Sequence, residues 1–554
     1  MEKIWLKNYP AGTPAEIDMG EFISLKDVIE KSFERFPERV AFLQMGTGLS
    51  YRELDELSAR FAAWLQQRGF RKGDRFAIML PNVLQYPVAM FGALRAGLVV
   101  VNTNPLYTAH ELEHQLRDSG AAGLLVLENF AAVAEKALPG TSVREVVVTG
   151  AGDMLGFPKA QVVNFVLRNV QKKVPDWHLP KATRFMRILK TGPEGPEPVE
   201  VGHDDIAFLQ YTGGTTGVAK GAMLTHGNLV ANLLQARAWF RQVDLNMTSY
   251  VCALPLYHVF SLTANCLLFT SVGGCGLLVT NPRDFKGFVK ELQGFPPNFF
   301  LGVNTLFNAL MDTPGFEKIN FEQLLATVGG GMAVQRVVAE RWKKLTGCTL
   351  SQGWGLTETS PIACVCLLQG QQFTGTIGLP VPSTEISMRD DDGNELPIGQ
   401  LGEICVRGPQ VMRGYWQRPD ETAKVMLPDG WLRTGDIGHM DSEGFVYIDD
   451  RKKDMIIVSG FKVFPAEVED VVAACPGVSE VAAVAQPDAK SGEVVALYIV
   501  RKDPSLTEAK LAAYCHDNLT AYKRPRTIIF RDELPKTNVG KILRRALRDE
   551  LAAG

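Results

Sequence analysis

Apolar side chains recur at two different spacings along the first three quarters of the chain. Over Leu54–Arg68 they repeat about every 3.6 residues, which predicts an amphipathic helix. Elsewhere they form short continuous runs, the pattern of strands that are covered by helices on both sheet faces. Together these patterns predict an α/β fold of layered helices and largely parallel sheets. The apolar runs lie at Gly97–Asn102, Gly123–Leu127 and Val146–Thr149.

The last hundred residues predict a second, smaller α/β domain. A chain of 554 residues is longer than one hydrophobic core usually supports. Charged residues interrupt the apolar pattern at Asp449–Lys453, so we place the boundary there, with a large N-terminal domain over 1–450 and a small C-terminal domain over 451–554. The expected C-terminal elements are strands at Val478–Ala485, Val494–Val500 and Arg526–Phe530, a helix at Thr507–Leu519 and a final amphipathic helix from Lys541.

The uncharged stretch Val259–Asn281 is long enough to cross a membrane. It also contains several polar side chains and the pair Gly273–Gly274. We therefore expect a buried helix, a glycine turn and a strand at Gly276–Thr280 in place of a membrane span.

The overall composition is that of a globular protein with little net charge. Lys and Arg number 58 against 61 Asp and Glu, which gives no basic field for nucleic acid. The nine cysteines show no CxxC pair or metal-ligand spacing, and Met1–Pro10 has no apolar core of signal-peptide length. This pattern favours a cytoplasmic protein without disulfides or zinc.

The strongest local signal for chemistry is the segment Tyr211–Gly221, which follows a predicted strand at Ile206–Leu209. Glycines let the backbone approach an anion closely, hydroxyls add donors, and Lys220 adds positive charge. Lys220 is followed by Gly221 and preceded by alanine, so the segment is not a Walker A loop. The residues expected to bind phosphate are Thr212, Gly213, Gly214, Thr215, Thr216, Gly217 and Lys220.

From this loop onward, a series of segments resembles the adenylate-forming enzymes, which include acyl-CoA synthetases, luciferases and the adenylation domains of peptide synthetases. The segments occur in the order expected for that family and span essentially the whole chain. The resemblance implies a large adenylate-forming domain followed by a small mobile α/β domain. The matching segments are Leu254-Pro-Leu-Tyr-His258-Val-Phe, Gly329-Gly-Gly-Met332, Gln352-Gly-Trp-Gly-Leu-Thr-Glu-Thr359, Gly402-Glu-Ile-Cys-Val-Arg-Gly408, Trp431-Leu-Arg-Thr-Gly-Asp436, Asp450-Arg-Lys-Lys-Asp454 and Asn538-Val-Gly-Lys541.

The resemblance implies a nucleotide site for ATP. Trp354 would stack on adenine, at a position where tyrosine is more common in the family. Asp436 would accept the ribose hydroxyls with help from Arg451. The rest of the nucleotide site would include Gly330, Gly331 and Thr357.

The resemblance also implies a magnesium ion and a set of catalytic side chains. Glu358 and Thr212 would supply the hard oxygen ligands that Mg²⁺ prefers. Lys541 would stabilise the charge that develops as a carboxylate attacks the α-phosphate, with Lys220 on the phosphates. His258 resembles the gate residue between nucleotide and acyl pocket, although a structural histidine remains an alternative, and we do not assign it as a general base.

Two reactions would have to share one cleft. Lys541 has to be present for adenylation, but it has to withdraw to admit the CoA thiol. Members of the family rotate the C-terminal domain about a hinge, which corresponds here to Lys453. Gly460 would then face the channel for CoA, where the lack of a side chain permits close approach.

The tract Asp429–Lys453 resembles the long signature of bacterial fatty-acyl-CoA synthetases. This resemblance implies that a medium- or long-chain fatty acid is activated to acyl-AMP, with release of pyrophosphate, and passed to CoA. Segments 295–307 and 329–332 resemble those that line the acyl pocket, although each residue could equally be plain core. The pocket residues would be Phe299, Val303, Phe307 and Gly331.

Two other functions stay open. One is a fatty-acyl-AMP ligase that loads a carrier protein in place of CoA. The other is a non-enzymatic lipid-binding relative. The presence together of Lys220, Glu358, Asp436 and Lys541 argues against the second, because binding a lipid requires none of them.

Residues 157–177 combine an apolar helical side with the cations Lys159, Arg168, Lys172 and Lys173. The apolar side consists of five valines and Phe165. Such a segment can lie in a membrane interface, which would give peripheral association with the inner membrane surface. Packing of the apolar side on its own domain is the alternative, and a homodimer is also left open.

Overall fold

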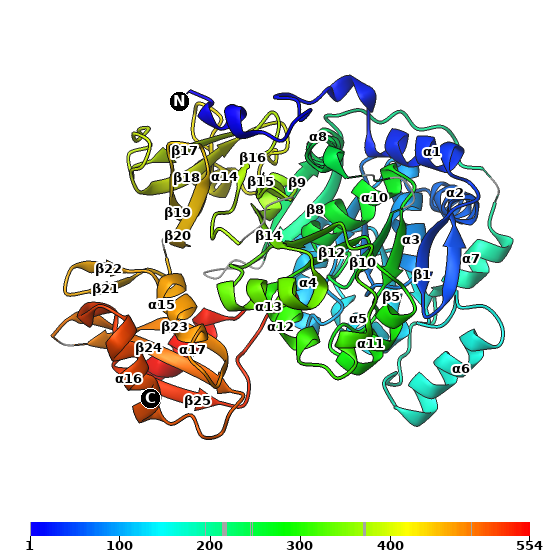
Figure 1. Cartoon of the computed structure of the whole chain (residues 1–554). Helices are drawn as coiled ribbons and strands as arrows, with labels where there is room; N and C mark the ends of the chain where they lie inside the picture. Colours follow the sequence, from blue (N-terminus) through cyan, green and yellow to red (C-terminus); the bar gives the residue numbers. More distant parts are fainter. Residues whose placement is uncertain are drawn as a thin grey trace.

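The computed structural model describes residues 2–193, 195–212, 219–243, 245, 248–368, 373–451, 453–488 and 490–553. It has an α/β architecture with a large N-terminal domain and a smaller C-terminal domain (Figure 1). One sheet of the large domain is parallel except for its last pair, β8 and β9. In spatial order this sheet consists of β7 (Thr183–Arg184), β6 (Glu145–Thr149), β5 (Gly123–Leu127), β3 (Arg75–Met79), β4 (Val99–Asn102), β8 (Ile206–Thr212) and β9 (Lys220–Thr225).

The second sheet of the large domain has a parallel centre and antiparallel ends. Its central strands β10, β11, β12 and β13 are short and mostly buried, as the sequence pattern predicts. In spatial order they are β16 (Leu379–Pro380), β15 (Ile362–Val365), β14 (Leu350–Gly355), β13 (Ala326–Gly329), β12 (Phe299–Gly302), β10 (Ser249–Cys252), β11 (Cys275–Leu278), β1 (Val40–Gln44) and β2 (Thr47–Ser50).

Two further sheets follow towards the C-terminus. The first is antiparallel, with β17 (Glu385–Arg389), β18 (Gly402–Arg407), β19 (Leu432–Met440) and β20 (Val446–Arg451) in that order. The second forms the small domain, orange to red in Figure 1. In it β24 pairs with β21, β23 and β25, and β22 pairs with β21. Its strands are β21 (Ile456–Val458), β22 (Phe461–Val463), β23 (Val478–Asp488), β24 (Gly492–Arg501) and β25 (Thr527–Arg531).

Helices cover these sheets, and their starts follow local chemistry. Helix α2 begins with a capping box, in which Ser50 Oγ accepts from the Glu53 N–H and the Glu53 carboxylate accepts from the Ser50 N–H. The helices are α1 (Leu25–Arg35), α2 (Tyr51–Gln67), α3 (Gln85–Arg95), α4 (Ala109–Ser119), α5 (Ala131–Ala137), α6 (Lys159–Phe165), α7 (Phe185–Thr191), α8 (His226–Trp239), α9 (Val259–Ser261), α10 (Leu268–Ser271), α11 (Phe285–Gln293), α12 (Asn304–Met311), α13 (Arg336–Thr346), α14 (Pro419–Val425), α15 (Pro465–Ala473), α16 (Glu508–Asn518) and α17 (Arg544–Ala553). Two π-helical segments, η4 (Val166–Val170) and η6 (Leu262–Leu267), continue α6 and α9.

The predicted elements of both domains are confirmed with small shifts. The C-terminal strands and α16 lie where the apolar runs predict them, but the final helix begins at Arg544, because Lys541 lies in a turn. The boundary in 449–453 stays a prediction: β20 ends at Arg451 and β21 begins at Ile456.

Most of the stretch 259–281 is buried, as expected. It forms α9, η6 and α10, then a left-handed turn at Gly273, and then β11. Within the described residues, no helix has the length and apolar character needed to cross a membrane.

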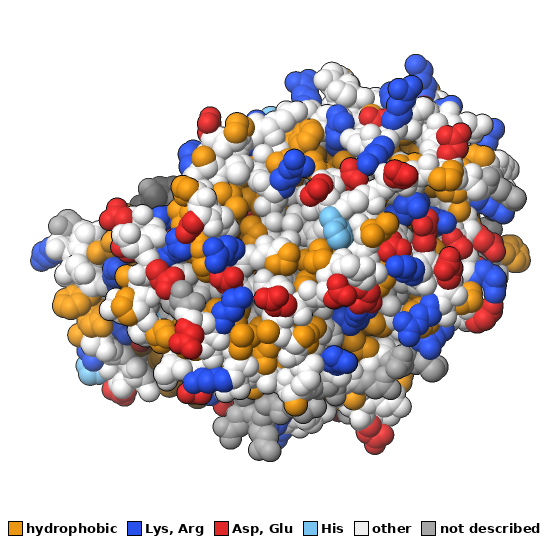
Figure 2. Space-filling model, turned by 90° about the horizontal axis from the view of Figure 1, so that it is seen from above, with side chains coloured by type: hydrophobic (Ala, Val, Ile, Leu, Met, Phe, Trp, Pro, Cys, Tyr) orange, Lys and Arg blue, Asp and Glu red, His pale blue; other side chains and the backbone are white. Residues whose placement is uncertain are grey.

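The surface carries charges of both signs. The face shown in Figure 2 has acidic and basic side chains interspersed over most of its area, in keeping with the net charge of -3. All nine cysteines lie in described segments and are free thiols.

Candidate functional site

The segment expected to bind phosphate connects two paired strands. Thr212 at the end of β8 and Lys220 at the start of β9 are register partners. The Thr212 hydroxyl lies 3.5 Å from the Lys220 carbonyl oxygen. The connecting residues Gly213, Gly214, Thr215, Thr216 and Gly217 lie outside the described residues. The two ends of the segment are therefore held together, with Thr212 and Lys220 side by side at its base.

A tyrosine links Lys220 to the expected magnesium ligand. The Tyr415 hydroxyl donates to Glu358 Oε1 over 2.7 Å, and the Lys220 ammonium lies 5.0 Å from the centre of the same ring. Lys220 also pairs with Glu421, and this pairing together with Lys424 lowers the pKa of Glu421 to about 2. The structure thus brings two predicted residues together through Tyr415, which the sequence analysis did not identify.

The expected ribose carboxylate is buried between two donors. Asp436 is 2% exposed, and its Oδ2 accepts the indole N–H of Trp354 at 2.9 Å. Its Oδ1 pairs with Arg451 Nε, also at 2.9 Å. Strands β14, β19 and β20 therefore bring an aromatic ring, a carboxylate and a guanidinium together, which suits recognition of a base and its sugar.

Glycines allow close packing beside this group. A Cβ on Gly330 would lie 3.0 Å from the Phe260 ring and 3.1 Å from the carbonyl of Gly353, the residue before Trp354. Thr357 lies in the short helix η8 (Thr357–Thr359), directly after β14. The predicted nucleotide residues on β14 and on the Gly330 loop thus lie close together.

Lys541, in the C-terminal domain, is affected by the charges of this polar group. Burial, then the charges of Arg451, Arg544 and Lys453, lower its pKa to about 7, while Asp436 acts in the opposite direction. Desolvation of the half-buried His258, and then the charge of Lys541, lower the histidine pKa to about 4. His258 is therefore neutral at pH 7, and its Nδ1 accepts the N–H of Phe260 at the start of α9.

The residues expected in the acyl pocket do not all lie together. A Cβ on Gly331 would lie 3.8 Å from Val303 Cγ1, so these two are neighbours. Phe307 lies in the same apolar cluster as Val303, packed against Trp342. Phe299 points to the opposite face of β12 and belongs to a different cluster. Adjacent strand positions alternate in direction, and the sequence could not assign the faces.

The expected hinge residue and the expected CoA residue lie at different places beyond β20. Lys453 lies between β20 and β21, two residues after Arg451. Gly460 lies at the exposed tip of the β21–β22 hairpin with φ +85°, and a Cβ there would have no atom within 4 Å. Figure 1 shows this hairpin on the side of the C-terminal domain away from α12 and α13. In this arrangement the turn before Lys541 contacts α12 of the large domain, where Gly540 accepts a hydrogen bond from Thr305, whereas Gly460 lies at the exposed end of its own hairpin.

Sequence reasoning missed a second anchor beside the phosphate segment. Asp118 accepts from the Tyr211 hydroxyl at 2.7 Å and from Arg418 Nη2 at 2.6 Å. Tyr211 is in β8, whereas Arg418 belongs to the segment Gly414–Pro419, in which two aromatic residues precede the arginine. That grouping of aromatic and basic residues was the available signal.

Comparisons with known proteins agree with this geometry. A family model for the AMP-binding enzymes matches residues 29–416, and one for the AMP-binding enzyme C-terminal domain matches residues 467–541. A long-chain-fatty-acid–CoA ligase of Escherichia coli O6:H1 (strain CFT073) is 55% identical, over 99% of this chain and 98% of the relative. The Haemophilus influenzae (strain Rd) long-chain-fatty-acid–CoA ligase is 52% identical over 99% of each chain.

The fold also matches solved structures. The anthranilate–CoA ligase AuaEII in complex with anthranoyl-AMP superposes with a TM-score of 0.86 at 24% identity, covering 97% of this chain and 99% of the other. This likeness concerns the fold, whereas the family follows from the full-length sequence matches. The chain belongs to the AMP-binding enzyme family and, within it, to the long-chain-fatty-acid–CoA ligases.

Proposed function

We propose that the protein activates a long-chain fatty acid with ATP and transfers the acyl group to CoA. A carboxylate oxygen attacks the α-phosphorus, pyrophosphate leaves, and acyl-AMP forms. The CoA sulfur then attacks the acyl carbonyl carbon, AMP leaves, and the thiol proton is released. The observation that carries the proposal is the docking of the turn before Lys541 on the large domain, where the Gly540 carbonyl oxygen accepts the Thr305 hydroxyl at 3.0 Å.

Each described residue has a role that its surroundings support. The Trp354 ring is the platform for adenine, and the buried Asp436 accepts the ribose hydroxyls. Lys220 faces the phosphates from β9. The ammonium of Lys541 stabilises the negative charge shared by the attacking carboxylate and the α-phosphate, an effect that commonly accounts for about two to three orders of magnitude in rate.

Magnesium fits the oxygen donors at this site. Glu358 is held by the Tyr415 hydroxyl, and Thr212 adds a second oxygen ligand from the end of β8. The described residues include no cluster of three His, Cys, Asp or Glu side chains that could bind a metal without help. Mg²⁺ usually takes one or two protein ligands together with phosphates and waters, and when bound it would neutralise charge on the triphosphate.

Transfer to CoA requires Lys541 to leave the cleft. We propose that the C-terminal domain turns about Lys453, which removes Lys541 and brings the exposed tip at Gly460 to the thiol channel. The absence of a side chain at Gly460 leaves room for the pantetheine arm. His258, neutral and half-buried, would separate the nucleotide from the acyl chain without taking a proton.

Release of pyrophosphate across fatty acids of increasing length, with and without CoA, tests this function. We expect rates that depend on chain length, stoichiometric acyl-AMP without CoA, and turnover to acyl-CoA with it. Acyl-AMP that accumulates in the presence of CoA would instead favour a ligase that loads a carrier protein. The absence of pyrophosphate release with any acid would contradict the proposal.

We also propose that the protein associates peripherally with an anionic membrane surface through α6 and η4. Phe157 is 87% exposed, and Val162, Phe165 and Val170 are each more than half exposed. Figure 1 shows α6 at the periphery of the large domain. A helix that packs on its own domain turns its large apolar side chains to the core. Here several of them are exposed, as expected for a helix that lies in a lipid interface.

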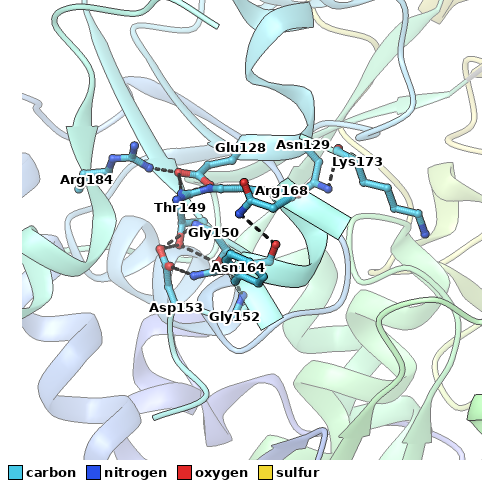
Figure 3. A network of polar contacts seen from close by, with 12 residues as sticks. Glu128, Asn129, Thr149, Gly150, Gly152, Asp153, Asn164, Arg168, Lys173 and Arg184 are labelled. Carbon is cyan, nitrogen blue, oxygen red and sulfur yellow. Dashed lines mark hydrogen bonds and ion pairs between the residues drawn. The ribbon is translucent and has the colours of Figure 1, made fainter. Parts of the chain in front are cut away.

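The side of the segment that faces the domain is held by polar contacts (Figure 3). Arg168 donates from both Nε and Nη2 to the buried carboxylate of Glu128, which Arg184 also contacts. Asn164 donates to Asp153 at 2.8 Å and accepts the Gly152 N–H at 2.9 Å. Arg168 is therefore committed to Glu128, a partner 40 residues earlier in the chain, and is not free to bind lipid.

The charge of this region matches an anionic bilayer. Residues 157–193 contain eight Lys and Arg and a single acidic residue, Asp176, in a chain whose net charge is -3. Lys172 and Lys173 are exposed, and in Figure 3 the Lys173 side chain points away from the polar network. Each cation near such a surface contributes about 1 kcal/mol, and each buried Phe contributes about 1.5–3 kcal/mol.

Flotation with phosphatidylglycerol-rich vesicles tests the membrane proposal. Phe157→Ser with Phe165→Ser should lower the bound fraction at least about tenfold. Lys172→Gln with Lys173→Gln should lower it on anionic but not on phosphatidylcholine vesicles. Ile23→Ser, which changes a side chain about as exposed as Phe165 but next to α1, far from α6 (Figure 1), is the control. Binding that survives the double Phe change would contradict the proposal.

A further inference from the structure

The turn that carries Lys541 rests on the start of helix α12. The Thr305 hydroxyl, in the second residue of that helix, donates to the Gly540 carbonyl oxygen over 3.0 Å. Thr305 belongs to the large domain, whereas Gly540 and Lys541 belong to the small one. This hydrogen bond therefore connects the two domains directly beside the lysine proposed to act in adenylation.

The turn is internally ordered, so that it moves as one piece. The Thr537 N–H donates to the Lys541 carbonyl at 2.7 Å, and the Lys541 N–H donates to the Thr537 hydroxyl at 3.1 Å. The Gly540 N–H donates to the Thr537 carbonyl at 3.0 Å. Because these bonds fix the shape of the turn, the position of the Lys541 side chain depends on where the turn is docked.

The docking surface fits a glycine closely. Gly540 has φ +83°, which favours glycine, and a Cβ there would lie 2.9 Å from Thr305 Oγ1 and 3.3 Å from Val303 Cγ2. The turn thus lies against the side chains at the start of α12. Val303 is also the neighbour of Gly331, so the docked turn lies next to the expected acyl pocket.

The receiving end of α12 is itself fixed. The Asn304 side chain donates to Gln335 Oε1 at 3.1 Å and accepts the Gln335 N–H at 3.0 Å, which ties the start of α12 to the start of α13. One turn further along α12, Asn308 Nδ2 lies 3.3 Å from the Ser479 carbonyl oxygen of the small domain. The start of α12 is therefore an anchored platform, and the small domain meets it at two places.

We infer that Thr305 is a positioning residue for the adenylation step: its hydroxyl holds the Gly540 carbonyl and so places the Lys541 ammonium in the cleft. The inference rests on the proposed function, because it assigns this hydrogen bond to one of two domain arrangements. The bond must break when the small domain turns to admit CoA. Thr305 therefore favours the first half-reaction and opposes departure from it.

Replacing the hydroxyl by a methyl group separates the two half-reactions. A hydrogen bond between neutral groups contributes about three- to tenfold in an equilibrium. Thr305→Val should slow single-turnover pyrophosphate release by about that factor. Thioester formation from supplied acyl-AMP and CoA should be unchanged or faster. Thr305→Ser should restore the first rate, because it keeps the hydroxyl.

A matched control makes the same chemical change elsewhere. Thr346 on α13 donates to the Trp342 carbonyl within its own helix, so Thr346→Val removes a hydroxyl without touching the Lys541 turn. Both half-reactions should keep their rates in that variant. A similar loss in Thr346→Val and Thr305→Val would indicate a general packing effect and would overturn the inference.

A double change distinguishes positioning of the lysine from a direct effect on the acyl site. In a Lys541→Ala background, Thr305→Val should cause no further slowing of adenylation, because the group that it positions is gone. Independent, multiplying losses would overturn the inference. If Lys541→Ala leaves adenylation intact, the proposed function of the lysine fails; if Lys541→Ala is damaging and Thr305→Val is neutral, only the role of Thr305 fails.

Discussion

Replacing Trp354 by phenylalanine removes one donor from the buried carboxylate that is proposed to hold the ribose. The ring that would stack on adenine is kept, but the N–H that Asp436 Oδ2 accepts at 2.9 Å is lost. Asp436 is 2% exposed, so water can replace that donor poorly. The free variant can turn the carboxylate towards Arg451, and nucleotide binding would have to turn it back.

The size of the effect follows from the kind of bond. A hydrogen bond to a charged group contributes about 1.5–3 kcal/mol, which corresponds to about 10- to 100-fold in affinity. Because the free variant recovers part of the loss through Arg451, we expect the Kd for ATP to rise about tenfold. The rate of adenylation at saturating ATP should change much less, since Lys541 is unaffected.

Calorimetric titration with a non-hydrolysable ATP analogue measures this change directly. Trp354→Tyr is the control, because a phenol also carries a donor. Asp436→Asn completes a double-mutant cycle, in which the two changes should not add, since Asp436→Asn removes the charge that strengthens this bond and Trp354→Phe removes its donor. An unchanged Kd in Trp354→Phe, or full additivity with Asp436→Asn, would refute the assignment.

Three other predictions follow from the site. Because the pKa of Lys541 is lowered to about 7, its charged fraction falls as pH rises through that value, so kcat/KM for adenylation should fall above pH 7. Lys541→Arg, which stays charged, should abolish the fall. A flat wild-type profile would contradict the lowered pKa. Lys453→Pro should spare acyl-AMP formation and cripple thioester formation, and equal losses in both steps would argue against the hinge. Glu358→Gln should raise the Mg²⁺ concentration needed for half-maximal pyrophosphate release at least about tenfold, a shift that titration of the metal would reveal or exclude.

Most of the fold could be predicted because residues close together in the sequence determine each helix and strand. The apolar runs behind β5 and β6 and the 3.6-residue spacing behind α2 each specify one element without reference to distant residues. The start of α17 was placed three residues early, because the bonds that hold the Lys541 turn differ from those of a helix.

Contacts between distant residues were the part that the sequence could not supply. Arg168 shows no acidic neighbour in its own segment, yet Glu128 reaches it from the end of β5. Tyr415 joins Lys220 to Glu358 although each comes from a different part of the chain. Phe299 in β12 and Phe307 in α12 belong to different apolar clusters. Because the environment on both faces of β12 is apolar, the residue types alone could not separate them. The residue types were informative, but their partners depend on the topology.

The carboxylate of Asp436 has a consequence for the choice of sugar. Its two oxygens together offer about four lone pairs, and Trp354 and Arg451 occupy two of them. A ribose with both vicinal hydroxyls would fill the remaining two, whereas a 2′-deoxy sugar would leave one buried acceptor without a donor. Such a deficit costs about 1–3 kcal/mol, so the enzyme should discriminate against dATP about five- to over a hundredfold. The remaining acceptor lone pairs of Asp436 would thereby exclude deoxynucleotides from fatty-acid activation.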